Sequence, residues 1–235
     1  MSQAATGDPV KQGSQYWIRN IVNDDVLRQR FEGMIGASGL DWFSPLAKDQ
    51  YKEYQLCSRD VYERLNMSSR FPYEEWRKQF SFWAGWPRRQ PVWDGLAVDT
   101  DVNAAGRTFY IVEAKARISE MKGTKMTASD PESRRRITEA MYEVYNIYYG
   151  HKGDFDKWTN GCYQLANRLT FLHKMNSKRC MFGFQTKLVL LNICNAGYGR
   201  TSDRQWRDYY KRVWPMMIGT DHEPDNVLVI NFDVR

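Results

Sequence analysis

Two apolar segments joined by a polar turn decide how this chain folds: Pro91-Val92-Trp93-Asp94-Gly95-Leu96-Ala97-Val98 and Thr108-Phe109-Tyr110-Ile111-Val112-Glu113-Ala114-Lys115-Ala116. The second segment follows Gly106 and starts with aromatic and β-branched residues, which predicts a strand from about Phe109 to Ala116. Alternation along a strand puts Ile111, Glu113 and Lys115 on one face. We expect the two segments to pair as an antiparallel hairpin, with two opposite charges inside an apolar strand.

Asp94 adds a third ionisable group to this hairpin, because antiparallel pairing brings its carboxylate next to Glu113. Burying a charge without a partner or a metal is strongly unfavourable, so these groups indicate a purpose beyond folding. Oxygen ligands alone suit Mg²⁺ or Mn²⁺, which also take water and phosphate oxygens. The hairpin therefore predicts a Mg²⁺ (or Mn²⁺) site at Asp94 and Glu113, with Lys115 beside it. The alternative is a surface hairpin with a Glu/Lys pair on its wet face.

Asp94 followed by Glu113-Ala114-Lys115 resembles the D…E-x-K signature of the PD-(D/E)XK nuclease superfamily, whose fold is restriction-endonuclease-like. In that superfamily the first Asp often follows a Pro, whereas here Trp93 precedes Asp94. The resemblance implies a metal-dependent phosphodiesterase that hydrolyses nucleic acid, with DNA as the expected substrate. It implies that Asp94, Glu113 and the carbonyl of Ala114 bind the metal, and that Lys115 orients the attacking water.

A fourth candidate ligand is Glu53. Apolar spacing predicts a helix from Pro45 to about Asn66, with Ser44 as its N-cap. Many members of the superfamily carry a Glu on the helix before the hairpin that completes the metal site, and the resemblance assigns this catalytic and metal-binding role to Glu53. A solvated helix carboxylate is the alternative.

Arg88 and Arg89 are candidate nucleic-acid contacts, because they follow a segment rich in aromatic residues, Tyr73 to Trp86. Aromatic side chains interleaved with arginine can stack on bases and bind phosphates. Packing beneath the sheet is the alternative explanation for the tryptophans.

Three more arginines, Arg134, Arg135 and Arg136, are expected in the first turn of a helix that starts near Ser129-Asp130-Pro131. Cations are unfavourable at that end of a helix, so a cluster of three indicates an anion from outside, such as a phosphate. An exposed basic turn explains the cluster equally well.

Gln164 and Arg168 lie four residues apart on a helix predicted from Trp158 to Met175, so they share a face. In the superfamily, a helix in this position often points polar groups at the site. The resemblance therefore makes Gln164 and Arg168 candidate nucleic-acid-binding residues.

The order of helices, hairpin, helices, strand, helix and strand predicts an α/β fold, with a mixed central sheet flanked by helices around a restriction-endonuclease-like core. The runs Lys187–Ile193 and Val227–Phe232 are the expected later strands. Together with Trp93-Asp94-Gly95-Leu96 and Glu113-Ala114-Lys115-Ala116, the run from Gln164 to Leu169 looks like an uncharacterised single-domain family within the superfamily. A nucleic-acid-binding or assembly protein that keeps the fold without cutting is the alternative function.

Size and composition agree with one compact domain over residues 16–235, preceded by a loose tail over residues 1–15. The net charge of +6 suits an anionic partner such as nucleic acid. The four scattered cysteines form neither a zinc motif nor a disulfide framework, so a reducing cytoplasm is the expected location. No apolar run approaches the roughly 18 residues that span a bilayer, so no membrane contact is expected. The oligomeric state stays open.

Overall fold

A five-stranded sheet forms the centre of the molecule in the computed structural model, which describes residues 13–80, 90–99, 106–197 and 200–235. In spatial order the strands are β1 (Asp41–Ser44), β4 (Gly95–Val98), β5 (Arg107–Lys115), β8 (Phe184–Cys194) and β9 (Val227–Asp233). Neighbouring strands are antiparallel from β1 to β5 and parallel from β5 to β9. The α/β class and the mixed central sheet expected from the sequence are confirmed.

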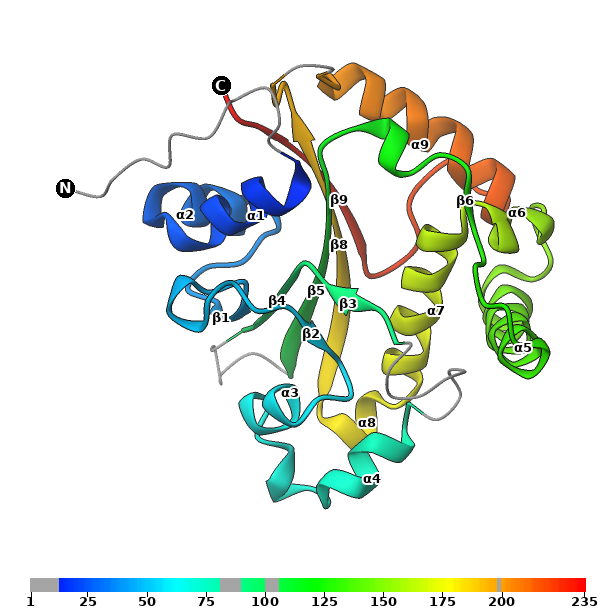
Figure 1. The fold of residues 1–235 in the computed structure, drawn as a ribbon, viewed down its shortest axis with the longest axis horizontal. Coiled ribbons are helices and arrows are strands. Elements are labelled where there is room, and N and C mark those ends of the chain that lie inside the picture. Colours follow the sequence, from blue (N-terminus) through cyan, green and yellow to red (C-terminus); the bar gives the residue numbers. More distant parts are fainter. Residues whose placement is uncertain (1–12, 81–89, 100–105, 198–199) are drawn as a thin grey trace.

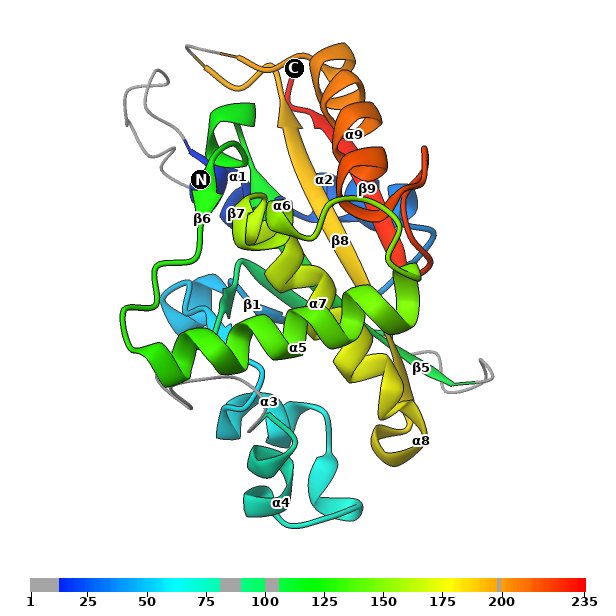
Figure 2. The same cartoon turned by 90° about the vertical axis from the view of Figure 1, so that its right-hand side faces the viewer.

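Helices cover both faces of this sheet (Figure 1). One face carries α1 (Ser14–Asn23) and α2 (Asp25–Met34). The other carries α5 (Pro131–Tyr149), α6 (Asp156–Thr159), α7 (Tyr163–Ser177) and α9 (Asp203–Ile218). Figure 2 shows α5 crossing the outer side of α7. Within the ranges given above, no helix is both long and apolar enough to cross a membrane.

The remaining elements are short and connect these layers. They are η2 (Ala47–Asp49), β2 (Tyr54–Gln55), α3 (Arg59–Arg64), η3 (Met67–Ser69), α4 (Tyr73–Lys78), β3 (Val92–Trp93), η4 (Ile118–Glu120), β6 (Thr124–Lys125), β7 (Asn160–Gly161) and α8 (Arg179–Phe182). Four of them form two small two-stranded sheets, in which β2 pairs with β3 and β6 pairs with β7.

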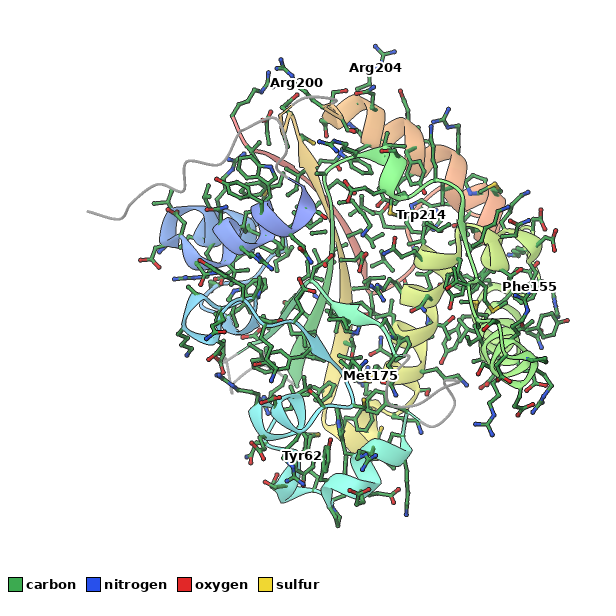
Figure 3. The ribbon with its side chains drawn as sticks, in the orientation of Figure 1. Tyr62, Phe155, Met175, Arg200, Arg204 and Trp214 are labelled. Atoms are coloured by element: carbon green, nitrogen blue, oxygen red, sulfur yellow. The ribbon has the colours of Figure 1, made fainter. Side chains whose placement is uncertain are left out.

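Strand β5 is buried on both faces and separates two apolar cores. Phe109 and Ile111 pack into the core under α5, α7 and α9, whereas Tyr110 and Val112 pack into the core under α1 and α2. In Figure 3, Met175 of α7 and Trp214 of α9 lie within the first of these cores. Because alternation continues along β5, Glu113 and Lys115 follow Phe109 and Ile111 on the α7 face. On this face of β5, the apolar side chains end at Ile111 and the charged ones begin at Glu113.

The helix expected from Pro45 to about Asn66 is not present. Residues 41–44 form β1, and within the expected range only α3 is an α-helix. Gln50 and Tyr51 have φ of 55° and 58°, a left-handed conformation that a continuous α-helix does not contain. The pairing of β1 with β4 and of β2 with β3 outweighs the local helix-start signal at Ser44. Glu53 consequently lies in the loop before β2 and not on a helix.

The other expected elements are confirmed. The runs Lys187–Ile193 and Val227–Phe232 lie within β8 and β9. The expected basic helix is α5, with Asp130 as the N-cap and Pro131 in its first turn. The helix expected from Trp158 to Met175 is mostly α7, because a break at residues 160–162 assigns Trp158 to α6.

Candidate functional site

Asp94 lies at a break between two short strands. Strand β3 pairs with β2, whereas β4 pairs with β5 from Gly95 opposite Val112 onward. The expected hairpin is thus confirmed from Gly95 to Val98, and it is wrong for the segment before Asp94, which pairs elsewhere. A Cβ atom at Gly95 would lie 3.3 Å from both Val112 and the Trp42 ring, so glycine permits the close approach of β4 at this point.

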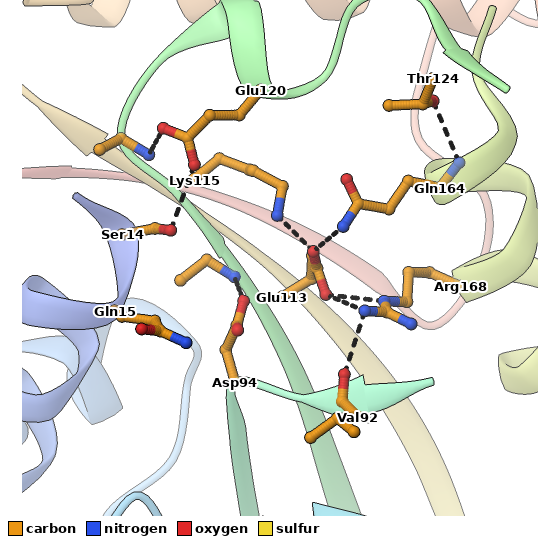
Figure 4. A network of polar contacts seen from close by, with 12 residues as sticks. Ser14, Gln15, Val92, Asp94, Glu113, Lys115, Glu120, Thr124, Gln164 and Arg168 are labelled. Atoms are coloured by element: carbon orange, nitrogen blue, oxygen red, sulfur yellow. Dashed lines mark hydrogen bonds and ion pairs between the residues drawn. The ribbon is translucent and has the colours of Figure 1, made fainter. Parts of the chain in front are cut away.

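The pairing of β4 with β5 ends at Gly95 and Val112, and β5 continues past it to Lys115. The Asp94 side chain lies beside this extension of β5. Its Oδ2 accepts a hydrogen bond of 2.7 Å from the backbone N–H of Ala114 (Figure 4). The N–H and C=O groups of one strand residue point to the same edge, so the Ala114 carbonyl also faces the Asp94 side. A carboxylate and a backbone carbonyl therefore face the same edge of β5.

Glu113 is 3% exposed and both of its carboxylate oxygens have partners. Oε1 accepts hydrogen bonds from Lys115 Nζ and, at 2.7 Å, from Gln164 Nε2. Oε2 accepts from Arg168 Nε at 2.7 Å and forms a contact of 2.6 Å with the terminal nitrogen Nη2 of the same guanidinium. Such charge-assisted contacts compensate the loss of water around a buried carboxylate.

Helix α7 supplies two of these partners. Gln164 and Arg168 share a face, as their spacing predicts, and that face points at Glu113 (Figure 4). Arg168 also donates to the carbonyl of Val92 at 3.1 Å, and its guanidinium lies 4.5 Å from the centre of the Trp93 ring. At 7% exposure, Arg168 is held within the site and not spread on an open surface.

The two acids at this site have opposite pKa shifts. Burial, together with the charge of Glu113, raises the pKa of Asp94 to about 7. Burial would also raise the pKa of Glu113, but the cations of Arg168 and Lys115 outweigh it and hold that pKa below its usual range. The site thus combines an acid whose ionised form is favoured with a second acid whose pKa is raised towards neutral.

Glu53 lies at the rim of this cluster. Its Oε1 accepts a hydrogen bond of 3.2 Å from Gln15 Nε2 of α1. Burial raises the pKa of Glu53; Arg19 and Gln15 oppose this rise, and the charge of Glu113 adds to it. Glu53 is therefore within electrostatic range of Glu113, although no hydrogen bond joins the two among the residues that the structure describes.

Two residues at the rim were not identified from the sequence. Glu120 of η4 accepts hydrogen bonds of 3.2 Å from the Ala116 N–H and from the Ser14 hydroxyl. Ser14 and Glu120 are 106 residues apart in the sequence, so no local pattern signals their contact. The start of α1 is thus attached to two acids that flank the site, Glu120 and Glu53.

The arginines at the start of α5 have partners on their own helix. Arg135 donates to Glu132 at 2.8 Å and to Glu139 at 2.6 Å, and Arg136 donates to Glu132 at 2.9 Å. Arg134 donates to the carbonyl of Ala128. In the described ranges no contact joins these arginines to Asp94 or Glu113. Two further sequence candidates, Arg88 and Arg89, lie outside the described residues.

The oxygen donors at Asp94 fit a hard divalent cation. Among the described residues, no group of three or more His, Cys, Asp or Glu side chains is arranged to hold a metal ion by itself. The set at this site is smaller, with the Asp94 carboxylate and the Ala114 carbonyl, and Glu113 joins it only if one of the four donors on its two oxygens is released. Mg²⁺ typically takes one or two carboxylates and completes its coordination with water and phosphate oxygens. Burial first and the charge of Glu113 second raise the pKa of Asp94, and a bound cation would favour its ionised form against both.

No protein-family model matches the chain, and comparisons with curated proteins and with solved structures find no match.

Proposed function

We propose that the protein is a metal-dependent phosphodiesterase of the PD-(D/E)XK type, with a restriction-endonuclease-like core. Its substrate is nucleic acid, with DNA as the first candidate. The observation that carries the proposal is the convergence of Asp94, Glu113 and Lys115 where β5 extends past β4. Asp94 precedes Glu113 by 19 residues and Ala114 by 20. A coincidental Glu-x-Lys sequence would give no reason for so distant an acid to accept a hydrogen bond from Ala114, the residue between Glu113 and Lys115, as Asp94 does.

The roles follow from the donor set. Asp94, Glu113 and the Ala114 carbonyl would hold Mg²⁺ or Mn²⁺, which when bound would polarise the scissile phosphate and activate a water. Lys115 lies on the same strand face as Glu113, where its ammonium orients that water or neutralises charge developing on the phosphate. Glu53, at the rim, contributes to the metal site through a bridging water. The cations of Lys115 and Arg168 balance the charge of Glu113 and, when it is ionised, that of Asp94, so the site accepts an anionic substrate together with a cation.

Helix α7 has a positioning role in this proposal. Arg168 and Gln164 donate to the two oxygens of Glu113, which fixes the orientation of this carboxylate. Arg134, Arg135 and Arg136 stay candidate phosphate contacts, since their side chains are exposed and the net charge of +6 favours a polyanion. Arg88 and Arg89 stay candidates on the sequence alone.

The test uses the purified chain with single- and double-stranded DNA and RNA, in Mg²⁺, Mn²⁺ or EDTA. Lys115→Ala should lower the cleavage rate about a hundredfold or more, the usual effect of removing one catalytic proton-transfer or charge-stabilising group. It should keep metal binding, measured by calorimetric titration. Asp94→Ala should lose both cleavage and the metal, because it removes a ligand.

Lys152→Ala, which changes an exposed lysine outside this cluster, is the matched control and should cleave as the unchanged protein does. Metal-independent cleavage, or a wild-type rate for Lys115→Ala, would contradict the assigned roles. Nucleic-acid binding without cleavage under every metal condition would favour the alternative, a binding or assembly protein that keeps the fold.

A further inference from the structure

A row of two amide side chains, Asn192 and Asn231, crosses the sheet at the level of Lys115. Lys115 of β5 is the register partner of Asn192 of β8, and Asn192 is the register partner of Asn231 of β9. Side chains of register partners lie next to one another on the same face of a sheet, which here is the face covered by α7 and α9. The row therefore leads from the candidate site into the core under α9.

The hydrogen bonds along this row run in one direction. Asp203, at the start of α9, accepts a hydrogen bond of 2.8 Å from Asn231 Nδ2, and Asn231 Oδ1 accepts one of 2.9 Å from Asn192 Nδ2. Asn192 Oδ1 in turn accepts from the Tyr210 hydroxyl at 3.2 Å. An ionised carboxylate can only accept, and Asp203 is paired with Arg207. The acid therefore fixes the orientation of both amides and makes Tyr210 the donor at the other end.

Tyr210 is left with a hydroxyl oxygen that can only accept a further hydrogen bond. A phenol has one proton, and Asn192 receives it. No donor among the described residues occupies the remaining lone pair, although Tyr210 is only 5% exposed. Burial, together with the charges of Tyr209 and Glu113, raises the pKa of Tyr210, so the phenol keeps its proton. The effect of Glu113 also shows that the hydroxyl lies within electrostatic range of the candidate site.

Lys115 is the most easily released of the donors around Glu113. Arg168 contacts both Glu113 and the carbonyl of Val92, and Gln164 is an uncharged amide. The Lys115 ammonium has Glu113 as its one acceptor in the described ranges, and any cation at Glu113 repels it. Lys115 is 8% exposed, and a buried ammonium without an acceptor is strongly unfavourable. On leaving Glu113, it therefore needs another acceptor close by.

We propose that Tyr210 is a positioning residue for Lys115, whose ammonium donates to the Tyr210 hydroxyl oxygen when metal binding releases it from Glu113. The inference rests on the proposed function, because it takes the metal to bind at Asp94 and Glu113. Asn192 brings the two groups together, since it lies beside Lys115 and accepts the proton of Tyr210. The ammonium then stays at the end of β5, where the proposed function needs it.

The first test is calorimetric titration of the full chain with Mg²⁺, without nucleic acid. Tyr210→Phe removes only the hydroxyl and should weaken Mg²⁺ binding about tenfold or more, the usual effect of losing a hydrogen bond to a charged group. Tyr209→Phe is the matched control, because Tyr209 is the preceding residue of α9, is similarly buried and lies outside the row. It should bind Mg²⁺ as the unchanged chain does. Circular dichroism checks that each variant folds, and an unchanged affinity in a folded Tyr210→Phe would overturn the proposal.

The second test asks whether the effect passes through Lys115. Lys115→Met leaves no ammonium to receive, so adding Tyr210→Phe to it should not weaken Mg²⁺ binding further. A merely structural role for Tyr210 would give the same loss in both backgrounds, and that result would overturn the proposal. The titration is independent of cleavage. A chain that binds Mg²⁺ but cuts no nucleic acid contradicts the proposed function alone, whereas a chain that binds no Mg²⁺ contradicts both.

The third test needs no substitution at Tyr210. In the full chain labelled with ¹³C at the tyrosine Cζ atoms, the Tyr210 resonance should shift when Mg²⁺ is added, because its oxygen gains a charged donor. The resonance is assigned from its backbone neighbours. It should stay in place in Lys115→Met under the same conditions. Mg²⁺ binding that leaves the Tyr210 resonance unchanged, or a shift of equal size in Lys115→Met, would overturn the proposal.

Discussion

Helix α7 contributes to two buried polar centres that handle ionisable groups in opposite ways. At its first turns, Arg168 and Gln164 join Lys115 around an ionised Glu113. Further along, His173 forms a hydrogen bond of 2.5 Å with the Tyr149 hydroxyl of α5 and stacks on the Tyr148 ring, with centroids 4.0 Å apart. The first centre keeps its charges and pairs them, whereas the second consists of groups that stay neutral.

The difference follows from what surrounds each group. Burial lowers the pKa of His173 to about 4, and within the described part of the chain no charged group opposes that effect. Burial also raises the pKa of Tyr149, so the hydroxyl keeps its proton. Glu113 is buried more deeply but has two cations in contact, and its pKa falls instead. Counter-charges within the fold, and not depth alone, decide which buried groups remain ionised.

The largest expected effect comes from removing a counter-charge at the first centre. Arg168→Met should lower the free energy of unfolding by about 3 to 5 kcal/mol, because it leaves the buried Glu113 short of one cation. Urea unfolding measures this change. The double variant Glu113→Gln with Arg168→Met should recover part of the loss. If the loss in the double variant equals the sum of the losses in Glu113→Gln and Arg168→Met, the ion pair is not the reason for the effect of Arg168→Met.

A slightly smaller effect is expected from Asp94 and pH. Its folded pKa of about 7 lies above the ordinary 3.8, so the folded state binds more protons between these values. Without metal, stability should fall as pH rises from about 4 to 7, by at most about 4 kcal/mol, and less where water screens the side chain. Asp94→Asn should lack this decline. Comparing the two proteins at each pH isolates the contribution, and equal slopes would contradict the shift.

His173 should give the opposite pH dependence. Its folded pKa of about 4 lies below the ordinary 6.5, so the unfolded state binds more protons between these values. Stability should be complete above about pH 6.5 and should fall by about 3 kcal/mol as the pH drops towards 4. His173→Gln should lose this acid sensitivity when both proteins are unfolded in urea across the same pH series. A wild-type acid response in the variant would assign the effect to other groups.

The smallest effect is expected at an exposed ion pair, the surface counterpart of Arg168. Arg135 contacts Glu132 and Glu139 on α5, and its side chain is 56% exposed. Arg135→Met should change the free energy of unfolding far less than Arg168→Met does, because water screens exposed pairs. The same urea titration used for Arg168 measures it. A loss as large as that of Arg168→Met would mean that burial does not separate the two kinds of arginine.

Much of the fold was readable from local pattern. Strands β5, β8 and β9 contain the runs expected from Phe109, Lys187 and Val227, because continuous apolar and β-branched residues suit a strand buried on both faces. The segment from Pro45 to Asn66 was misread, because its helix-start signal is local and the competing pairing of β1 with β4 is not. Local propensity is a weak guide where tertiary pairing decides.

The candidate site divides in the same way. Strand alternation was sufficient to put Glu113 and Lys115 on one face, and helical spacing was sufficient to put Gln164 and Arg168 on another. That these two faces meet depends on how α7 packs on the sheet, which no short pattern encodes. The same holds for the contact of Ser14 with Glu120.

The contacts of α7 with Glu113 also affect how the chain folds during its synthesis on the ribosome. Arg168 is added to the growing chain 55 residues after Glu113, which at ribosomal rates of about 5 to 20 residues per second takes roughly 3 to 11 seconds. During that interval β5 has neither its parallel neighbour β8 nor its main counter-ion, so the acid must remain in water. The nascent N-terminal half is therefore expected to stay open, and accessible to chaperones, until α7 and β8 have been synthesised.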